Sequence, residues 1–213
     1  DTGITQFGVY QRFTFVPGNK LLFYDDFSKD TPGDFPALWE TGGSGEVVTT
    51  SAYEGNWLSL QRRSGYMPAM AKELPENYTI EFDLISNGFN SRSRGTLFFA
   101  FLSKKAYSMG QGGSLADMEL RFGDDLTFEK VENFGGEVTV KIGTAIDRHL
   151  TDAVNSKVHF SIAVNGQRLA IWMDQKKYVD APTILQANIG KYFILEARDI
   201  SPDNGQLVAI SNF

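Results

Sequence analysis

The stretch SKVHFSIAVNGQRLAIWMD, residues 156–174, contains two alternating apolar runs joined by Asn165-Gly166. An Asn-Gly pair accepts the positive φ angles of a tight turn, so the stretch predicts a β-hairpin in which Val164 faces Gln167. Counting outward gives one apolar face, which pairs Ile162 with Leu169, Phe160 with Ile171 and Val158 with Met173. The other face pairs Ala163 with Arg168, Ser161 with Ala170 and His159 with Trp172. We expect the apolar face to pack on a core.

The second face of this hairpin carries small or polar side chains and one large ring, Trp172. Such a face leaves room above a sheet, as a ligand-binding groove does. An ordinary solvent-exposed face fits the same pattern, so the two interpretations stay open.

The composition favours one large β domain. The chain has 213 residues, 42% of them hydrophobic and 17 of them Phe, which is enough for a sizeable core. We expect residues 1–19 to be an N-terminal lead-in and residues 20–213 to form a single domain.

Charge and cysteine content exclude several classes of protein. The net charge is −6 with no long basic cluster, which argues against nucleic-acid binding. The sequence has no Cys, which excludes disulfides, thiol catalysis and Cys-ligated zinc. No run reaches 18 apolar residues and no basic-then-apolar leader is present, so we expect neither a membrane span nor a signal peptide in these residues.

Alternation and turn signals predict an all-β, antiparallel domain with short strands. Residues 95–103 are apolar on both faces, so that strand is expected to be central and to lie under a covering segment. The segment 144–155 is the only one with helical character. The expected strands are 20–27, 46–52, 56–62, 68–74, 78–86, 95–103, 116–122, 126–132, 137–142, 178–180, 191–198 and 206–211.

Several of these motifs occur in an order that resembles the concanavalin A-like lectin/glucanase jelly roll. The motifs are KLLFYDDFS (20–28), DFPALWETGGSGEVV (34–48), NWLSL (56–60), YTIEFDL (78–84) and SIAVNGQRLAIWMDQKKY (161–178). Over most of residues 20–198 the chain is similar to the jelly-roll domains that precede OmpA-like modules in bacterial cell-envelope proteins. The resemblance implies a two-sheet antiparallel β-sandwich with any carbohydrate site on its concave face or rim. It also implies export to the periplasm, outer membrane or cell surface, and a downstream module that would anchor the protein at peptidoglycan.

One strand carries acids at the spacing that hydrolytic members of this superfamily use. Those members place Glu-x-Asp-x-(x)-Glu on one strand, with nucleophile and proton donor about 5 to 5.5 Å apart. Here Asp117 and Glu119 alternate, but Arg121 stands where a third acid is needed. Because an Arg holds a neighbouring carboxylate ionised, it opposes a general-acid role. A solvated strand face is therefore favoured over catalysis.

Sugar binding needs an aromatic ring that stacks on a pyranose and polar partners beside it. Our candidates for ligand binding are Trp172, His159, Arg168 and Glu119. Further aromatic residues in Gly-rich loops are candidates for the rim, namely Tyr66, Phe89, Tyr107 and Phe134. The alternative is that another segment covers Trp172.

A structural Ca²⁺ ion is the one cofactor that the sequence suggests, because hard cations need several oxygen ligands. The candidate ligands are Asp25, Asp26 and Asp199. Acids in turns are more often simple turn formers.

We therefore expect a non-catalytic recognition or structural domain of an exported envelope protein, with an oligosaccharide or an envelope protein as partner. A protein-interaction or spacer domain without a small ligand is the first alternative. A glycoside hydrolase with an atypical acid pair is the second.

Overall fold

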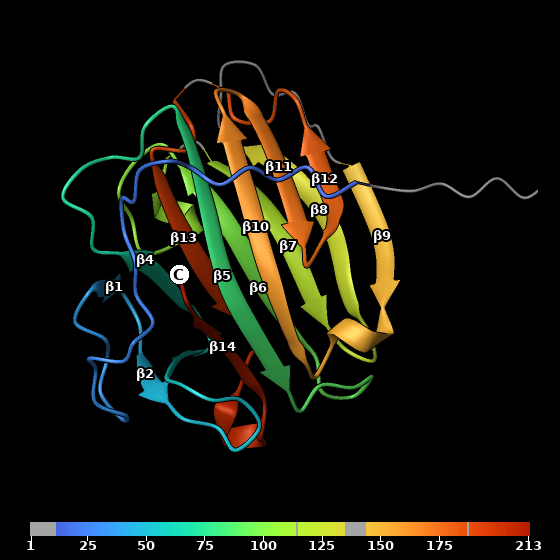
Figure 1. Cartoon of the computed structure of the whole chain (residues 1–213). Coiled ribbons are helices and arrows are strands. Elements are labelled where there is room, and N and C mark those ends of the chain that lie inside the picture. The colour runs from blue at the N-terminus through green and yellow to red at the C-terminus, as the bar shows by residue number, and fades with distance from the viewer. Residues whose placement is uncertain (1–11, 114, 135–143, 187) are drawn as a thin grey trace, which may run out of the picture.

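The computed structural model describes residues 12–113, 115–134, 144–186 and 188–213. They form two seven-stranded antiparallel sheets that face each other (Figure 1). Sheet A has the order β1 (Trp39–Thr41), β4 (Ser64–Pro68), β13 (Tyr192–Arg198), β6 (Gly95–Leu102), β7 (Leu115–Phe122), β8 (Leu126–Phe134) and β9 (Thr144–Leu150). Sheet B has the order β12 (Lys176–Ala181), β11 (Arg168–Met173), β10 (Lys157–Asn165), β5 (Asn77–Asn87), β14 (Leu207–Ser211), β3 (Trp57–Leu60) and β2 (Gly45–Val48). The three helices in the described residues are 3₁₀ turns, namely η1 (Met109–Gln111), η2 (Thr151–Ala153) and η3 (Pro202–Asn204).

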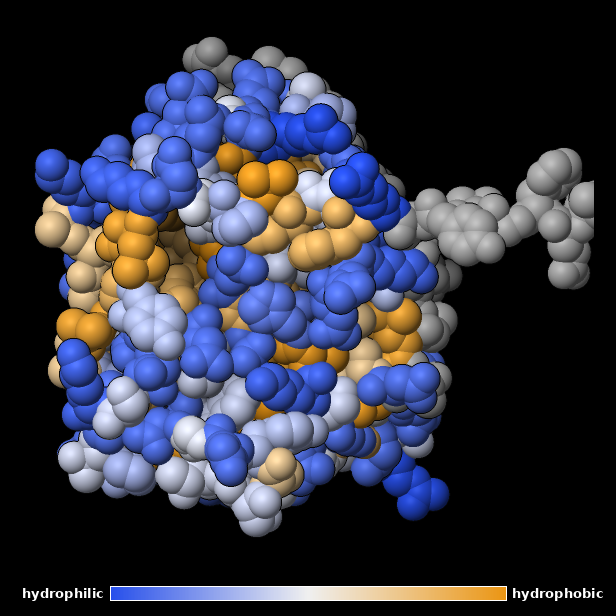
Figure 2. All heavy atoms as spheres, in the orientation of Figure 1, coloured by the Kyte–Doolittle hydropathy of each residue, from blue (hydrophilic) through white to orange (hydrophobic). Residues whose placement is uncertain are grey.

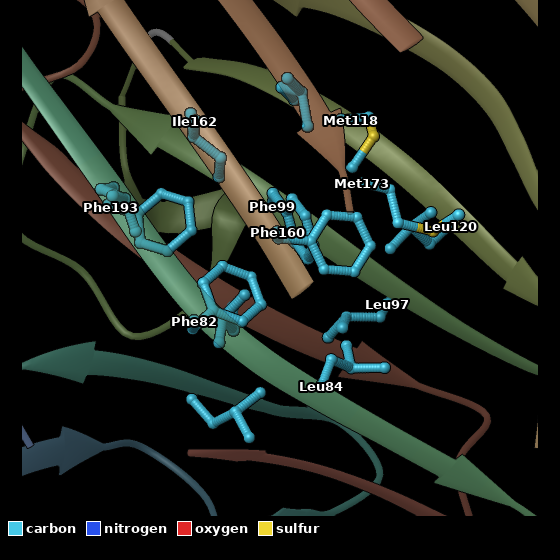
Figure 3. Packing of buried hydrophobic residues seen from close by; sticks show 14 of the residues in the cluster. Phe82, Leu84, Leu97, Phe99, Met118, Leu120, Phe160, Ile162, Met173 and Phe193 are labelled. Carbon is cyan, nitrogen blue, oxygen red and sulfur yellow. The ribbon is translucent and has the colours of Figure 1, made fainter. Parts of the chain in front are cut away.

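This architecture confirms the predicted two-sheet antiparallel β-sandwich. The core lies between the sheets, where rings from both layers meet (Figure 3). Phe82 on β5 contacts Phe99 on β6 edge to face, with centroids 5.3 Å apart, and stacks on Phe160 of β10 at 5.5 Å. All three side chains are fully buried. Burial of such rings is the main favourable contribution to the stability of the sandwich.

The hairpin predicted from residues 156–174 is confirmed as β10 and β11, but its register is not the predicted one. Asn165 pairs with Arg168, so Gly166 and Gln167 form the turn. Gly166 has φ +57, as in a II′ turn with glycine at the first central position. Its N–H donates to the side chain of Asn77 on β5 at 2.9 Å, which holds the turn in this position. Since the shift changes each pairing by two residues, the assignment of side chains to the two faces is unchanged.

β6 is covered on its outer face, as its two apolar faces predicted. The segment 103–113 folds back over sheet A and packs Ala106 and Met109 on Phe98, Ala100 and Leu102. The central position of β6, between β13 and β7, agrees with the same prediction.

Three strand or helix predictions were wrong. Residues 20–27 form no strand, because only Asp25 pairs with the main chain of a distant segment, at Phe213, while Phe27 bonds locally to Asp30. The strand expected at 68–74 lies earlier, at β4, and ends at Pro68, which has no N–H to continue the ladder. The helical segment expected at 144–155 contains β9 and η2, since pairing with β8 outweighs a weak local preference. The expected strand 137–142 lies outside the described residues.

Residues 12–24, called the strap, run without regular secondary structure across the outer face of sheet B and then beside β5 (Figure 1, blue). The Gly18 N–H donates to Thr79 Oγ1 at 3.0 Å. Beyond the strap, Asp25 and Phe213 exchange two main-chain hydrogen bonds of 2.9 and 3.0 Å. The strap is therefore held at its middle and just beyond its C-terminal end. No helix in the described part of the chain is long and apolar enough to cross a membrane.

Candidate functional site

The polar side chains of sheet A gather on its outer face, around β7. Met118 and Leu120 of β7 point into the core, so Asp117 and Glu119 project to the other side. β8 lies beside them and places Glu132 opposite Asp117. The two strands therefore bring carboxylates from separate parts of the sequence onto one surface.

These side chains line a pocket of about 430 Å³, called the acidic pocket. Its floor comes from β6, β7, β8 and β13, and η1 of the covering segment forms one wall. The lining residues are Phe98, Met109, Gly110, Leu115, Asp117, Glu119, Lys130, Glu132 and Arg198.

Cations hold two of the carboxylates in place. Lys130 Nζ lies 2.9 Å from Glu132 Oε2 and 3.8 Å from Glu119 Oε2. Arg121 Nε donates to Glu119 Oε1 at 2.8 Å, which engages the carboxylate as the sequence suggested. Glu119 is buried and Lys130 is partly exposed, so the ammonium shields the carboxylates at the mouth of the pocket.

The wall of the pocket is fixed by Glu196 on β13. Its Oε2 accepts a 2.6 Å hydrogen bond from the main-chain N–H of Met109, and its Oε1 lies 2.8 Å from an Arg198 guanidinium nitrogen. The same guanidinium sits over the Phe98 ring, 4.8 Å from its centroid. Glu196 thus ties the covering segment to sheet A, and Arg198 remains beside the pocket.

Asp117 is the most perturbed group in the site. Its side chain is only 2% exposed, and Oδ1 has no hydrogen-bond partner among the described residues. Burial, with the nearby carboxylate of Glu132 as the next cause, raises the pKa of Asp117 to about 7. Near neutral pH the pocket therefore holds a carboxyl group that is about half protonated, beside carboxylates that are bound to cations.

The candidates Trp172, His159 and Arg168 lie elsewhere, on the outer face of sheet B, so they do not form one site with Glu119. Trp172 is 5% exposed because the strap covers it: Phe15 meets its ring edge to face at 5.4 Å. Its indole nitrogen has no hydrogen-bond partner among the described residues. While the strap is in this position, the ring is not available for stacking on a sugar.

The two other candidates on sheet B are engaged by carboxylates. His159 Nδ1 lies 2.8 Å from Asp83 and Nε2 lies 3.3 Å from Glu81. Arg168 makes a bidentate pair with Asp180 of β12, at 2.8 and 2.7 Å, and Lys177 donates to the same carboxylate at 2.8 Å. A role of these side chains in ligand binding stays a prediction.

The rim candidates are mostly enclosed. Tyr66 and Phe89 are buried, whereas Tyr107 is 37% exposed and its hydroxyl donates to Glu40 at 3.3 Å. The Phe134 side chain lies outside what the structure describes.

The Ca²⁺ candidates make other contacts. The two oxygens of Asp25 accept hydrogen bonds from the Phe27 N–H and the Trp39 indole N–H, and Asp26 accepts one from the Ser28 N–H. Asp199 lies 3.8 Å from the guanidinium of Arg62. Within the described ranges no group of three or more His, Cys, Asp or Glu could hold a metal ion. The Ca²⁺ site remains a prediction without support from this geometry.

The contributions of β8 and β13 to the acidic pocket were missed from the sequence. The motif Lys130-Val131-Glu132 alternates in the same way as Asp117-Met118-Glu119, and the expected strands 116–122 and 126–132 leave only residues 123–125 for a turn between them. Pairing the two strands across that turn would have predicted the neighbours on β8. The β13 residues Glu196 and Arg198 reach the site only through the strand order of the sheet, for which the sequence carries no local signal.

No protein-family model and no curated protein matches the sequence. Solved structures do match its fold. The Bacillus licheniformis β-glucanase is 17% identical, with 92% of this chain and 97% of that chain covered and a TM-score of 0.51. A family 16 glycoside hydrolase endo-glucanase from Bacteroides ovatus is 11% identical, with 90% and 87% covered and a TM-score of 0.50. A structure from work on endo-acting O-glycanases of the human gut microbiota is 12% identical, with 91% and 100% covered and a TM-score of 0.54.

At these identities the likeness shows the fold alone, and the fold is the concanavalin A-like jelly roll predicted from the sequence. The expectation that the chain is not an enzyme needs correction. The fold is shared with family 16 glucanases, so it gives no ground for placing the chain in a non-catalytic class.

Proposed function

We propose that the chain binds a carbohydrate in the acidic pocket of sheet A. The observation that carries the proposal is the convergence of Asp117, Glu119 and Glu132 with Lys130 and Arg198 around one open pocket. Sugar hydroxyls both donate and accept hydrogen bonds, and this lining offers acceptors and donors side by side. The free Oδ1 of the buried Asp117 supports a ligand group at this position.

Charge balance in the pocket favours a neutral sugar. Glu119 is paired with Arg121, Glu132 with Lys130 and the neighbouring Glu196 with Arg198, while Asp117 is half protonated near neutral pH. Because these charges balance one another, a strongly anionic or cationic ligand would find no excess of opposite charge in the pocket. The ring of Phe98 is 7% exposed, so hydrogen bonds rather than stacking would supply most of the recognition.

The test is calorimetric titration with neutral oligosaccharides of the β-glucan, plant cell-wall and mucin types. Glu132→Gln keeps the shape of the side chain and removes the ion pair with Lys130. We expect it to weaken binding by about tenfold, as loss of one charge-assisted hydrogen bond predicts. Glu81→Gln, on the outer face of sheet B, is the matched control and should leave binding unchanged.

Two outcomes would contradict the proposal. Binding that Glu132→Gln leaves intact but Trp172→Ala abolishes would place the site on the hairpin face. No heat with any sugar, from a folded protein, would favour the protein-interaction alternative.

Hydrolysis is the second candidate function, and the raised pKa of Asp117 is the observation that favours it. A glycosidase needs one protonated and one ionised carboxyl group near the scissile bond. Asp117 would be the acid, and Glu119 or Glu132 the ionised partner. Release of reducing ends from β-glucans that is lost in Asp117→Asn would establish it, whereas equal release by both proteins would exclude this assignment.

We also propose that the domain works in a bacterial cell envelope, where an OmpA-like module elsewhere in the protein would attach it to peptidoglycan. The support is the resemblance of residues 20–28 and 34–48 to such envelope domains. Cell fractionation with an antibody against this domain tests the location. Recovery of the protein only in the cytosolic fraction would contradict it.

A further inference from the structure

A second and larger pocket, of about 690 Å³, lies between the strap and the open end of the sandwich. One side of it is β5. β14 pairs with β5 only from Asp83 to Asn87, so among the described strands the earlier half of β5 has a neighbour on the β10 side alone. The pocket therefore lies along an unpaired stretch of a strand edge. We call it the edge pocket.

The pairing pattern identifies which main-chain groups face this pocket. Ser86 donates its N–H to Ser156, toward the β10 side. Since antiparallel strands alternate, the odd-numbered residues of β5 present N–H and C=O to the opposite side. Thr79 and Glu81 are the odd-numbered residues beyond the end of β14, and both line the edge pocket. They offer an incomplete ladder of hydrogen-bonding groups.

The walls of the pocket are apolar and its rim is basic. The apolar lining includes Leu22, Met70, Leu74, Ile80, Phe193 and Phe213. Around this part of the surface, Figure 2 shows apolar side chains gathered next to a hollow that hydrophilic residues border. The lysines of the lining are Lys20, Lys72, Lys105 and Lys191.

Three of these lysines are free to meet a ligand. Lys105 is paired with Glu40 at 2.7 Å, but Lys20, Lys72 and Lys191 have no ion-pair partner among the described residues. Glu81 is the carboxylate of the lining, and His159 holds it at 3.3 Å. A basic rim on a chain of net charge −6 indicates an anionic ligand.

We propose that the edge pocket binds a short extended peptide with alternating apolar and acidic side chains, which adds to β5 as a strand. Its main chain would pair with the N–H and C=O groups of Thr79 and Glu81. Its apolar side chains would enter the pocket, and its acidic ones would meet Lys20, Lys72 and Lys191. Hydrogen bonds hold the strap at Gly18 and hold Asp25, the residue that follows the strap. The added strand would therefore lie between β5 and the strap.

A capped, fluorescent pentapeptide of alternating valine and glutamate is the probe, and fluorescence anisotropy measures its binding. We expect saturable binding that weakens by about tenfold when alternate amide nitrogens of the probe are methylated. The probe with lysine in place of glutamate should bind no more tightly than the methylated probe. Equal binding of the methylated probe would overturn strand addition.

Two pairs of variants test the protein side. Thr79→Pro removes the N–H that faces the pocket, while Thr79→Val keeps it, and both lose the hydroxyl that Gly18 uses. We expect about tenfold weaker binding for the proline variant only. Lys72→Glu should weaken binding similarly, whereas Lys29→Glu, on an exposed lysine outside the pocket, should not.

The remaining outcomes also decide the question. If Thr79→Pro does not fold, the methylated probe still tests the pairing. Decanoate that displaces the probe and binds Thr79→Pro as tightly as the parent would identify the site as one for an alkyl carboxylate and overturn the peptide. An unchanged affinity in Lys72→Glu would overturn the role of the basic rim.

Discussion

Replacement of Asp117 by Asn should make the protein more stable at alkaline pH, although it removes a charge from the centre of the acidic pocket. The side chain is buried, and its pKa of about 7 lies about three units above the ordinary value of 3.8. A raised carboxyl pKa means that the folded state binds the proton more tightly than the unfolded state. Stability is therefore greatest while Asp117 is protonated and falls as pH rises from about 4 to about 7.

The size of this effect follows from the shift. One pKa unit corresponds to about 1.4 kcal/mol, so ionisation of Asp117 costs at most about 4 kcal/mol of unfolding free energy. Lys130 and Arg198 favour the ionised form of Asp117, whereas Glu132 and Glu119 oppose it. The pKa of about 7 already includes the effects of all four side chains. The Asn side chain does not ionise, so the variant does not lose this unfolding free energy as pH rises.

Urea unfolding at pH 4.5 and pH 8 measures the difference. We expect the variant to be within about 1 kcal/mol of the parent at pH 4.5 and more stable by about 2 to 4 kcal/mol at pH 8. Asp203→Asn, at an exposed position in η3, is the control and should show no such pH dependence. A stability difference between Asp117→Asn and the parent that is the same at both pH values would refute the reasoning.

Three further predictions concern other parts of the fold. Phe15→Ala should uncover Trp172, so acrylamide should quench a larger share of the tryptophan emission; an unchanged quenching curve would mean that the strap does not shield the ring. The hydrogen bond that the Nδ1–H of His159 donates to Asp83 raises the pKa of His159, which stabilises the fold below pH 6.5 and progressively less as pH rises past the raised value. NMR titration should show this pKa falling toward 6.5 in Asp83→Asn, and an unchanged value would exclude the contact as its cause. Asp25→Ala should lose about 1 to 3 kcal/mol of unfolding free energy, because it leaves a buried indole N–H without its acceptor, and this loss should be independent of added Ca²⁺.

Local patterns in the sequence predicted the strands that alternate strictly. The faces of β10 and β11 were correct because side-chain alternation has a period of two and survives a shift of two residues. The register itself was not, because Asn77 of a third strand holds Gly166 in the turn. A contact from outside the hairpin is invisible to reasoning on the hairpin alone.

The same limit explains the strap and the site. Residues 20–27 look like a buried strand, yet Leu21 and Tyr24 are more than half exposed, because no strand in the described part of the chain pairs with them. Asp117 and Glu119 were recognised by their spacing on one strand. Glu196 joins the acidic pocket from another strand, and the order of strands in a sheet follows from the packing of the whole domain.

The outermost position of β12 in sheet B bears on how the protein behaves at high concentration. A terminal strand leaves one row of N–H and C=O groups unpaired, which is a template for polymerisation with other chains. β12 begins with Lys176 and Lys177, and Lys177 also sits over the Trp172 ring at 5.3 Å. A second copy that docked its own β12 would bring like charges together as it lost solvent. The two lysines thus oppose fibril-like stacking of a domain whose regular secondary structure is almost entirely β-strand.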